Sequence, residues 1–295
     1  MINSTIRAKI RKIKVHTKRV MQSSLSGDYL SAFKGSGLEF DQLRDYQMGD
    51  DIRFIDWNSS AKMNKIMVKQ FIEERDRTVI IAIDVSASSR YASQEELRKD
   101  SIAQVATALA FIAEENKDKV GALFFSDRIE KWIPPSRGPL HVGSLLETIF
   151  SLEPKGTGTN FNEALRFLIN AKKRNAIVFM LSDWINNAND YSKLLKVASV
   201  EYDFIGMRFQ DPCETNFPDI GLLEVHDPET GAIFTLDTRK KRQEVSPLNL
   251  FINKEWRLQK EMFSKYNIDL LDFIIGRPFI NPLIRFFHQR IRRQI

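Results

Sequence analysis

Apolar residues occur along this chain in short, nearly continuous runs that are rich in β-branched and aromatic side chains. This pattern is typical of strands that are buried on both faces of a parallel sheet. The runs predict five strands, over residues 78–84, 120–125, 176–182, 202–209 and 268–275. Segments with helical spacing separate them, and one of these helices is expected to open with a capping box formed by Ser93 and Glu96. Alternating strands and helices predict an α/β fold, a mostly parallel sheet with helices on both faces.

Three further segments have patterns of their own. Residues 5–22 place apolar side chains opposite basic ones at helical spacing, which predicts an amphipathic helix. Residues 222–237 predict a β-hairpin insertion. Near the C-terminal end, Asn281 is the predicted N-cap and Pro282 the first residue of a second amphipathic helix. We therefore expect three regions, an N-terminal helix with a small subdomain, the α/β domain and a basic C-terminal helix, over residues 1–77, 78–275 and 276–295.

The bulk composition is that of a globular protein, because 43% of the 295 residues are hydrophobic. A single cysteine, Cys213, excludes an internal disulfide and favours a reducing compartment. No apolar stretch approaches the roughly 20 residues that span a bilayer, and the N-terminal segment lacks the apolar region of a signal peptide. We expect a cytoplasmic protein, with peripheral contact to the inner membrane as an open alternative.

The net charge of +6 is concentrated at the two ends of the chain. Residues 1–20 hold seven basic residues and residues 273–295 hold five, with no acidic residue in either segment. Removing these twelve from the 44 basic residues leaves 32, against 38 acidic residues in the body. Basic ends of this kind dock on an acidic partner, an anionic membrane surface or, less favoured here, nucleic acid, or they are the solvated side of helices that pack on the domain.

A carboxylate and two hydroxyls directly follow the strand over residues 78–84. Asp84, Ser86 and Ser88 lie past the carboxyl end of a central strand, the edge at which open α/β sheets bind ligands. Thr159, in a loop that enters a helix, and Asp183, at the end of another buried strand, are expected at the same edge. Such hard oxygen ligands suit Mg²⁺, or alternatively Mn²⁺ or Ca²⁺, far better than zinc. These five residues therefore predict a magnesium site, although Asp84 and the serines could instead only cap the turn.

The same residues carry a family resemblance. Asp84-x-Ser86-x-Ser88, followed by Thr159 and Asp183, resembles the metal-ion-dependent adhesion site of von Willebrand factor A domains. Upstream, Leu43-Arg44-x-Tyr46-x-x-Gly49-Asp50-Asp51-x-Arg53-x-Ile55-Asp56-Trp57 resembles the bacterial family catalogued as domain of unknown function 58, which pairs such a segment with a von Willebrand A-like domain. Ala87 and Ser89 stand where that family often has glycine and methionine, but neither is a proposed ligand.

The resemblance implies a protein-interaction module rather than an enzyme. It implies that the five residues hold Mg²⁺ and that an acidic side chain of a partner protein completes the ion's coordination. Family members are typically linked to MoxR-type AAA+ ATPases, so such an ATPase is the expected partner. The expected role is the assembly or remodelling of protein complexes, or tolerance of envelope stress.

Two other functions remain open at the level of sequence. A metal-dependent phosphoester hydrolase would use the same ion, but no general base is evident and Arg90 is the nearest basic residue in sequence. An adaptor for nucleic acid or a membrane surface would use the basic ends. The charged residues between 39 and 57 are interpreted as structural, with Arg–carboxylate pairs under Trp57 that fasten this small region to the main domain.

Overall fold

The computed structural model of the chain separates into two compact units, one of Phe33–Asp76 and one of Met1–Ala32 with Arg77–Ile295. Among the described residues before Phe33, Tyr29 and Ala32 belong to the larger unit. The Tyr29 hydroxyl donates to Asp118 over 2.8 Å, and the Tyr29 ring packs on Phe287 of the C-terminal helix. The structure describes residues 8, 10, 11, 13, 15, 29, 32–33, 38–73, 77–90, 92–93, 96–173, 176–185, 188–215, 221–226, 233–237 and 247–294.

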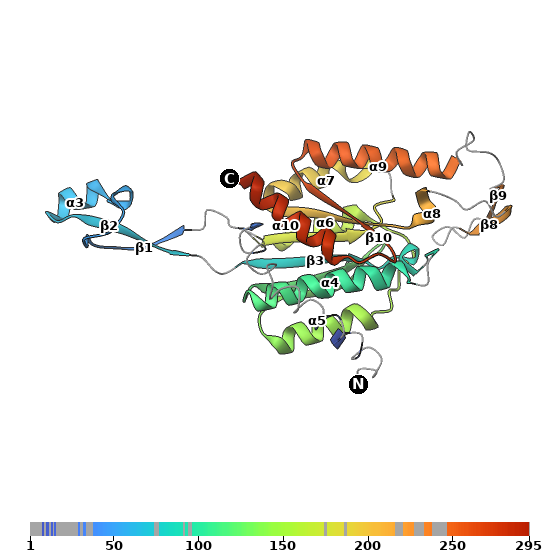
Figure 1. Cartoon of the computed structure of the whole chain (residues 1–295), viewed down its shortest axis with the longest axis horizontal. Coiled ribbons are helices and arrows are strands. Elements are labelled where there is room, and N and C mark those ends of the chain that lie inside the picture. The colour runs from blue at the N-terminus through green and yellow to red at the C-terminus, as the bar shows by residue number, and fades with distance from the viewer. Residues whose placement is uncertain are drawn as a thin grey trace. The chain divides into compact units, whose positions relative to one another are not determined.

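The larger unit is built on a six-stranded sheet with the strand order β10-β7-β6-β3-β4-β5 (Figure 1). All neighbouring strands are parallel except β5, which runs antiparallel to β4. The strands are β3 (Thr78–Asp84), β4 (Lys119–Phe125), β5 (Ile129–Ser136), β6 (Ala176–Ser182), β7 (Asp203–Gln210) and β10 (Asp269–Ile274). The five predicted strands and the mostly parallel sheet are confirmed, whereas β5 was not predicted.

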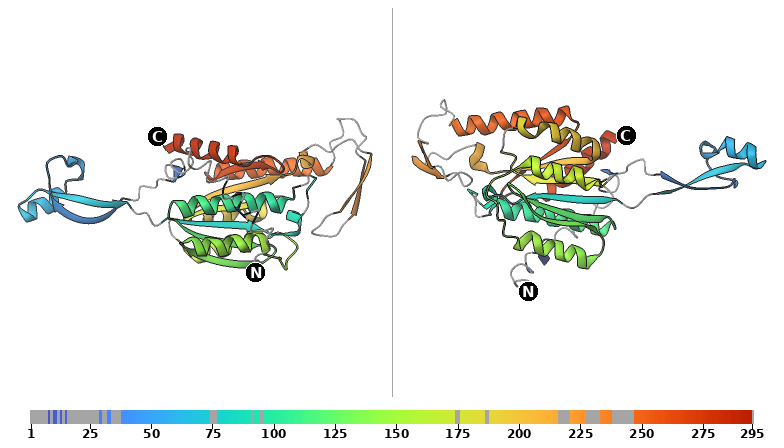
Figure 2. Two further views of the ribbon diagram at one scale, coloured as in Figure 1. Left: turned by 60° about the horizontal axis from the view of Figure 1, so that its bottom comes forward. Right: turned by 180° about the vertical axis from the view of Figure 1, so that it is seen from behind.

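Helices cover both faces of this sheet, as Figure 1 and Figure 2 show. The helices of the described part of this unit, apart from the described residues before residue 77, are η3 (Ala87–Arg90), α4 (Arg98–Glu115), α5 (Pro139–Ser151), α6 (Phe161–Ala171), α7 (Ala188–Glu201), α8 (Pro212–Thr215), α9 (Pro247–Lys265) and α10 (Ile280–Gln294). Helices α6, α7 and α9 pack on one face, where their apolar residues share a core with Ile80, Val178 and Phe204 of the sheet. Helix α4 packs on the other face, and α5 lies against α4. Side chains of a strand alternate between the two faces of a sheet. Leu270 packs against the core that the sheet shares with α6, α7 and α9, so Leu271 and Phe273 point to the opposite face, which α10 covers.

Two predicted helix starts are wrong. Helix α4 begins at Arg98 and not in the predicted capping box, because Ser93 bonds to Asp211 over 2.6 Å through its backbone N–H and Glu96 accepts from Ser101 and Gln104. Helix α10 begins at Ile280, before the predicted cap. Asn160 caps the start of α6, since its side chain accepts from the Glu163 N–H over 3.2 Å.

The remaining predicted segments are described in part. Strands β8 (Leu222–His226) and β9 (Ile233–Asp237) form the predicted antiparallel hairpin. Of the predicted helix over residues 5–22, only residues 8, 10, 11, 13 and 15 are described, and all five are helical. The rest of that helix lies outside the described residues. None of the helices in the described part of the chain has the length and apolar character needed to cross a membrane.

The smaller unit is a two-stranded antiparallel ribbon of β1 (Leu38–Asp45) and β2 (Met67–Glu73), connected through η2 (Ile52–Phe54) and α3 (Trp57–Met63). Its predicted Arg–carboxylate pairs form inside the unit itself. Arg44 binds Asp50 through two hydrogen bonds of 2.7 and 2.6 Å, and Arg53 binds Asp51. The interpretation that these pairs fasten the region to the main domain is therefore wrong, because both partners of each pair belong to the same unit. Trp57 is 69% exposed, so its ring does not bury these ion pairs.

Candidate metal site at the carboxyl edge of the sheet

Asp84 ends the central strand β3 and is the most buried carboxylate of the predicted site, with 3% of its surface exposed. Its Oδ1 accepts a hydrogen bond from the Ser86 N–H over 2.9 Å. Its Oδ2 accepts from the Ser182 hydroxyl over 2.6 Å and lies 3.5 Å from the Thr159 hydroxyl. These donors come from the turn after β3, the last residue of β6 and the loop before α6, so these three segments meet at Asp84.

The two serines follow Asp84 in a tight turn. Their hydroxyl oxygens lie 3.0 Å apart, and the Ser86 carbonyl accepts from both the N–H and the hydroxyl of Ser89, over 3.2 and 2.7 Å. The Ala87 N–H donates to the Thr157 carbonyl over 2.8 Å, which ties this turn to the loop that carries Thr159. The spacing i, i+2, i+4 thus brings Ser86 and Ser88 to the same side of the turn, as predicted.

Glu130 of β5 holds the loop that carries Thr159. Its Oε1 accepts from the Ser126 hydroxyl and from the N–H groups of Lys155 and Gly156, over 2.7, 3.1 and 2.7 Å. A Cβ at Gly156 would lie 2.2 Å from the Ser126 hydroxyl oxygen, so a larger residue there would displace this anchor. Burial opposes ionisation of Glu130, but the N–H donors outweigh it and hold its pKa below the usual value. The loop is therefore fixed by an ionised carboxylate on a strand that the sequence did not reveal.

A sharp turn after β6 positions Asp183. Trp184 adopts the left-handed conformation with φ of 57°, which is uncommon for a residue other than glycine. Its fully buried ring stacks on Phe161, with centroids 4.7 Å apart and planes at 8°. Because Phe161 begins α6, two residues after Thr159, this stacking fixes the Asp183 turn relative to the Thr159 loop.

Arg98 is the main component of the site that the sequence analysis missed. It opens α4, is 5% exposed, and its Nη1 donates to Asp183 Oδ2 over 2.7 Å and to the Ser88 carbonyl over 3.2 Å. Its Nη2 binds Glu214 of α8. One signal was available, because a positive charge in the first turn of a helix opposes the helix dipole and needs compensation. Ser182, Glu214 and Glu130 were missed as well, since only the fold brings them to this edge.

The charges at this edge do not balance. Asp84, Asp183 and Glu214 face one guanidinium, which leaves an excess of two negative charges when all four groups are ionised. Burial, reinforced by the Asp183 charge, raises the pKa of Asp84 to about 6. Burial also raises the pKa of Glu214 to about 7, although Arg98 opposes this shift. A divalent cation would supply the missing positive charge.

The residues present fit a hard divalent cation. The structure brings together all five predicted residues, whose side chains offer two carboxylates and three hydroxyls, the donor type that Mg²⁺ prefers. Within the described residues there is no group of three or more His, Cys, Asp or Glu side chains that could hold a metal. A site here would therefore depend on the hydroxyls of Ser86, Ser88 and Thr159, and its occupancy by a metal stays a prediction.

Comparisons with known proteins agree with the family resemblance of the upstream segment. The model of the family described as "Protein of unknown function DUF58" matches residues 42–247. The uncharacterized proteins Rv1480 of Mycobacterium tuberculosis and Mb1516 of Mycobacterium bovis are each 26% identical over 234 residues, which is 78% of this chain and 74% of theirs.

Several solved structures are similar over most of their length. BatB from Bacteroides thetaiotaomicron, described as a conserved hypothetical protein, aligns with a TM-score of 0.47 at 16% identity over 73% of this chain and 97% of its own. An aerotolerance-related membrane protein from Bacteroides fragilis aligns with a TM-score of 0.48 at 16% identity, over 73% and 98% of the two chains. The VWA domain of SpRpn10 aligns with a TM-score of 0.43 at 13% identity, over 71% and 94%.

Proposed function

Because this chain belongs to the DUF58 family of proteins of unknown function, and because its sheet edge gathers carboxylates and hydroxyls with unbalanced negative charge, we propose that it is a metal-dependent protein-interaction module. The observation that carries this proposal is the convergence of Asp84, Ser86, Ser88, Thr159 and Asp183 at the carboxyl edge of the sheet. When bound there, Mg²⁺ supplies a positive charge that attracts an oxygen ligand from outside the chain.

Arg98 supports the idea that the outside ligand is anionic. Asp183 already shares its charge with this guanidinium, so it would neutralise a bound cation less than a free carboxylate does. Neutral hydroxyls make up the rest of the proposed ligand set, and Mg²⁺ binds six oxygens, so a coordination position remains for a ligand from outside the chain. A glutamate or aspartate of a partner protein would fill that position, and binding would then require both the ion and the partner's carboxylate.

We place the module with a MoxR-type AAA+ ATPase, acting in the assembly or remodelling of protein complexes or in tolerance of envelope stress. This assignment follows from the resemblance of the upstream segment and of the five site residues to their family. The single cysteine, Cys213, favours a reducing compartment, so we place this activity in the cytoplasm, with peripheral contact to the inner membrane as the alternative.

The hydrolase alternative gains no support from the arginine found at the site. A phosphoester needs a cationic side chain that is free to bind its oxygens. Both terminal nitrogens of Arg98 are taken up by Asp183 and Glu214, and only 5% of the residue is exposed. Its position is that of a structural counter-charge and not of a phosphate clamp.

Capture of partners from a native lysate tests the proposal. The purified full chain is used as bait in Mg²⁺ and in EDTA, beside Asp84→Asn, which keeps the size of the side chain but removes its charge. Asp190→Asn, at an exposed position on α7, is the matched control. We expect partners that bind the wild type and the control only in Mg²⁺ and that do not bind Asp84→Asn. Identical partners in every lane would contradict the proposal.

A further inference from the structure

The outer edge of β10 is an unprotected strand edge. Within the described part of the chain this strand pairs only with β7, and the Ile275 N–H donates to the Gln210 carbonyl over 3.0 Å. Backbone groups alternate between the two sides of a strand, so Leu270 and Asp272 direct their N–H and C=O groups away from β7. At the opposite end of the sheet, β5 contains Pro134 and Pro135, which lack N–H groups and discourage pairing. Strand β10 contains no proline.

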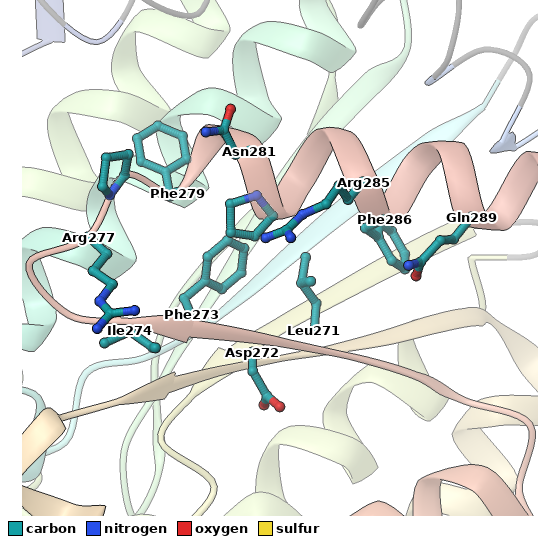
Figure 3. A pocket seen from close by; sticks show the side chains of 12 residues that line it. Leu271, Asp272, Phe273, Ile274, Arg277, Phe279, Asn281, Arg285, Phe286 and Gln289 are labelled. Carbon is teal, nitrogen blue, oxygen red and sulfur yellow. The ribbon is translucent and has the colours of Figure 1, made fainter.

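A groove runs along this edge. Two adjoining hollows of about 440 and 450 Å³ share Leu271, Phe286 and Gln289 in their walls. The first hollow is lined by β10, by α10 and by the segment between them, and the second also reaches α9. In Figure 3, Leu271 and Phe273 point from the strand toward α10. The groove therefore combines apolar side chains with a strand edge that can accept another strand.

Two uncompensated arginines give the groove its charge. Arg277 and Arg285 line the first hollow, both are exposed, and neither forms an ion pair within the described part of the chain. The two carboxylates along the groove are already neutralised. Asp272 points away from α10 in Figure 3 and binds Arg208 over 2.7 Å. Asp269 binds Arg290 and Arg293 over 3.1 and 2.6 Å.

We propose that this groove binds an extended acidic segment of a partner protein, which pairs with β10 as an additional strand. The segment's backbone would hydrogen-bond to Leu270 and Asp272, its carboxylates would meet Arg277 and Arg285, and its apolar side chains would pack in the groove. An anionic membrane surface accounts for the arginines less well, because lipid headgroups do not form a ladder of hydrogen bonds with a strand edge. This proposal does not depend on the metal site.

A peptide selection tests the charge that the groove prefers. A display library of random peptides of about ten residues, long enough for one strand, is selected on the full chain. We expect enrichment of acidic peptides with interspersed apolar residues. The best peptide should bind the double variant Arg277→Gln with Arg285→Gln at least about tenfold more weakly, since close charge pairs contribute this much or more. Arg292→Gln, exposed on the same helix but outside the groove, is the control and should bind normally.

Amide hydrogen exchange tests the strand pairing. With the best peptide bound, the amides of Leu270 and Asp272 should exchange more slowly, and those of β8 should not change. Circular dichroism checks that each variant is folded. The proposal would be overturned by enrichment of neutral or basic peptides or by equal affinity for the double variant. It would also be overturned if peptide binding did not slow the amide exchange of Leu270 and Asp272. Binding of vesicles of phosphatidylglycerol that requires Arg277 and Arg285, without selection of acidic peptides, would assign the arginines to a lipid surface instead.

Discussion

At the scale of single residues, Arg98 and Glu214 set the charge around the predicted ligands. Arg98 joins Asp183 to Glu214, and all three side chains are largely shielded from water. Breaking a buried ion pair by removing one partner leaves an uncompensated charge, which typically destabilises a protein by about 3–5 kcal/mol. The same burial raises the pKa of Glu214, so this carboxylate ionises at a higher pH in the folded protein than in the unfolded chain.

We predict that stability falls as the pH rises from about 4.5 to about 7. The pKa of Glu214 is about 7 in the folded protein, against the ordinary value of 4.5. Between these values the folded state keeps a proton that the unfolded chain has released, so the unfolded state binds fewer protons and is favoured as the pH rises. The full shift corresponds to about 3 kcal/mol. Urea unfolding at a series of pH values in EDTA measures it.

Glu214→Gln identifies the source of this slope. The amide can still accept a hydrogen bond from Arg98 but does not titrate, so the decline of stability with pH should become shallower. Some slope should remain, because the pKa of Asp84 is also raised, to about 6. Glu261→Gln, on an exposed pair with Arg257, is the control and should keep the full slope. An identical slope in Glu214→Gln would show that Glu214 is ionised throughout this range.

The sequence predicted which residues gather at the sheet edge better than it predicted the residues that surround them. Asp84, Ser86 and Ser88 share one turn, so their spacing alone places them together. Thr159 and Asp183 followed from the rule that parallel strands end at one edge. The approach of Arg98 to Asp183, 85 positions away, depends on how α4 packs, and no local pattern encodes that contact.

At the scale of elements, contacts outside the proposed ligand set hold the strand ends and loops of the site together. The turn after β6 and the start of α6 are joined by the stacked rings of Trp184 and Phe161. The loop before α6 is joined to β5 through Glu130. The antiparallel strand β5 thus positions Thr159 although it contributes no proposed ligand.

We predict that Glu130→Ala loosens the Thr159 loop. The N–H groups of Lys155 and Gly156 would lose their shared acceptor, and losing such a charged acceptor typically destabilises by about 1–3 kcal/mol. Hydrogen exchange over residues 155–158 should become faster, and the affinity for Mg²⁺ should fall several-fold while the fold persists. Glu153→Ala, an exposed neighbour, is the control. Unchanged exchange in Glu130→Ala would remove Glu130 from the account of how the loop is held.

The elements that were mispredicted share a cause, which is that tertiary contacts override a local signal. Strand β5 has half-buried, irregular alternation and two prolines, so it does not resemble the buried strands. The Ser93 and Glu96 pair has the spacing of a capping box, but Ser93 bonds to Asp211, which directly follows β7. The buried runs of β3 and β6 were predicted correctly because a parallel strand covered on both faces must be apolar throughout.

At the scale of the whole molecule, the basic C-terminal helix packs on the α/β domain along most of its apolar side. Leu283 and Phe287 of α10 are fully buried, and Arg290 binds Asp203 and Asp269. The expectation that this end packs on the body is therefore confirmed for the apolar side of the helix. Of the basic residues on and before this helix, Arg277 and Arg285 line the groove without an acidic partner in the described part of the chain. The positive charge of this end is therefore concentrated at one surface.

The larger unit thus has two surfaces with different chemistry. The carboxyl edge of the sheet is acidic and suited to a divalent cation, whereas the groove along β10 is basic and apolar. Only the first could be predicted from the sequence, because it follows a motif with fixed spacing. The groove arises from the packing of α10 against an edge strand, which single-sequence patterns do not specify.

Calorimetric titration of Mg²⁺ into the full chain tests the central claim most directly. The account predicts a single binding event in the wild type and in Asp190→Asn, and a loss of at least about tenfold in affinity in Asp84→Asn, in keeping with the usual effect of altering a metal site. Unfolding in urea, with and without Mg²⁺, should show stabilisation of the wild type by the ion. Absence of binding in the wild type, or equal affinity in Asp84→Asn, would contradict the claim that these five residues form a cation site.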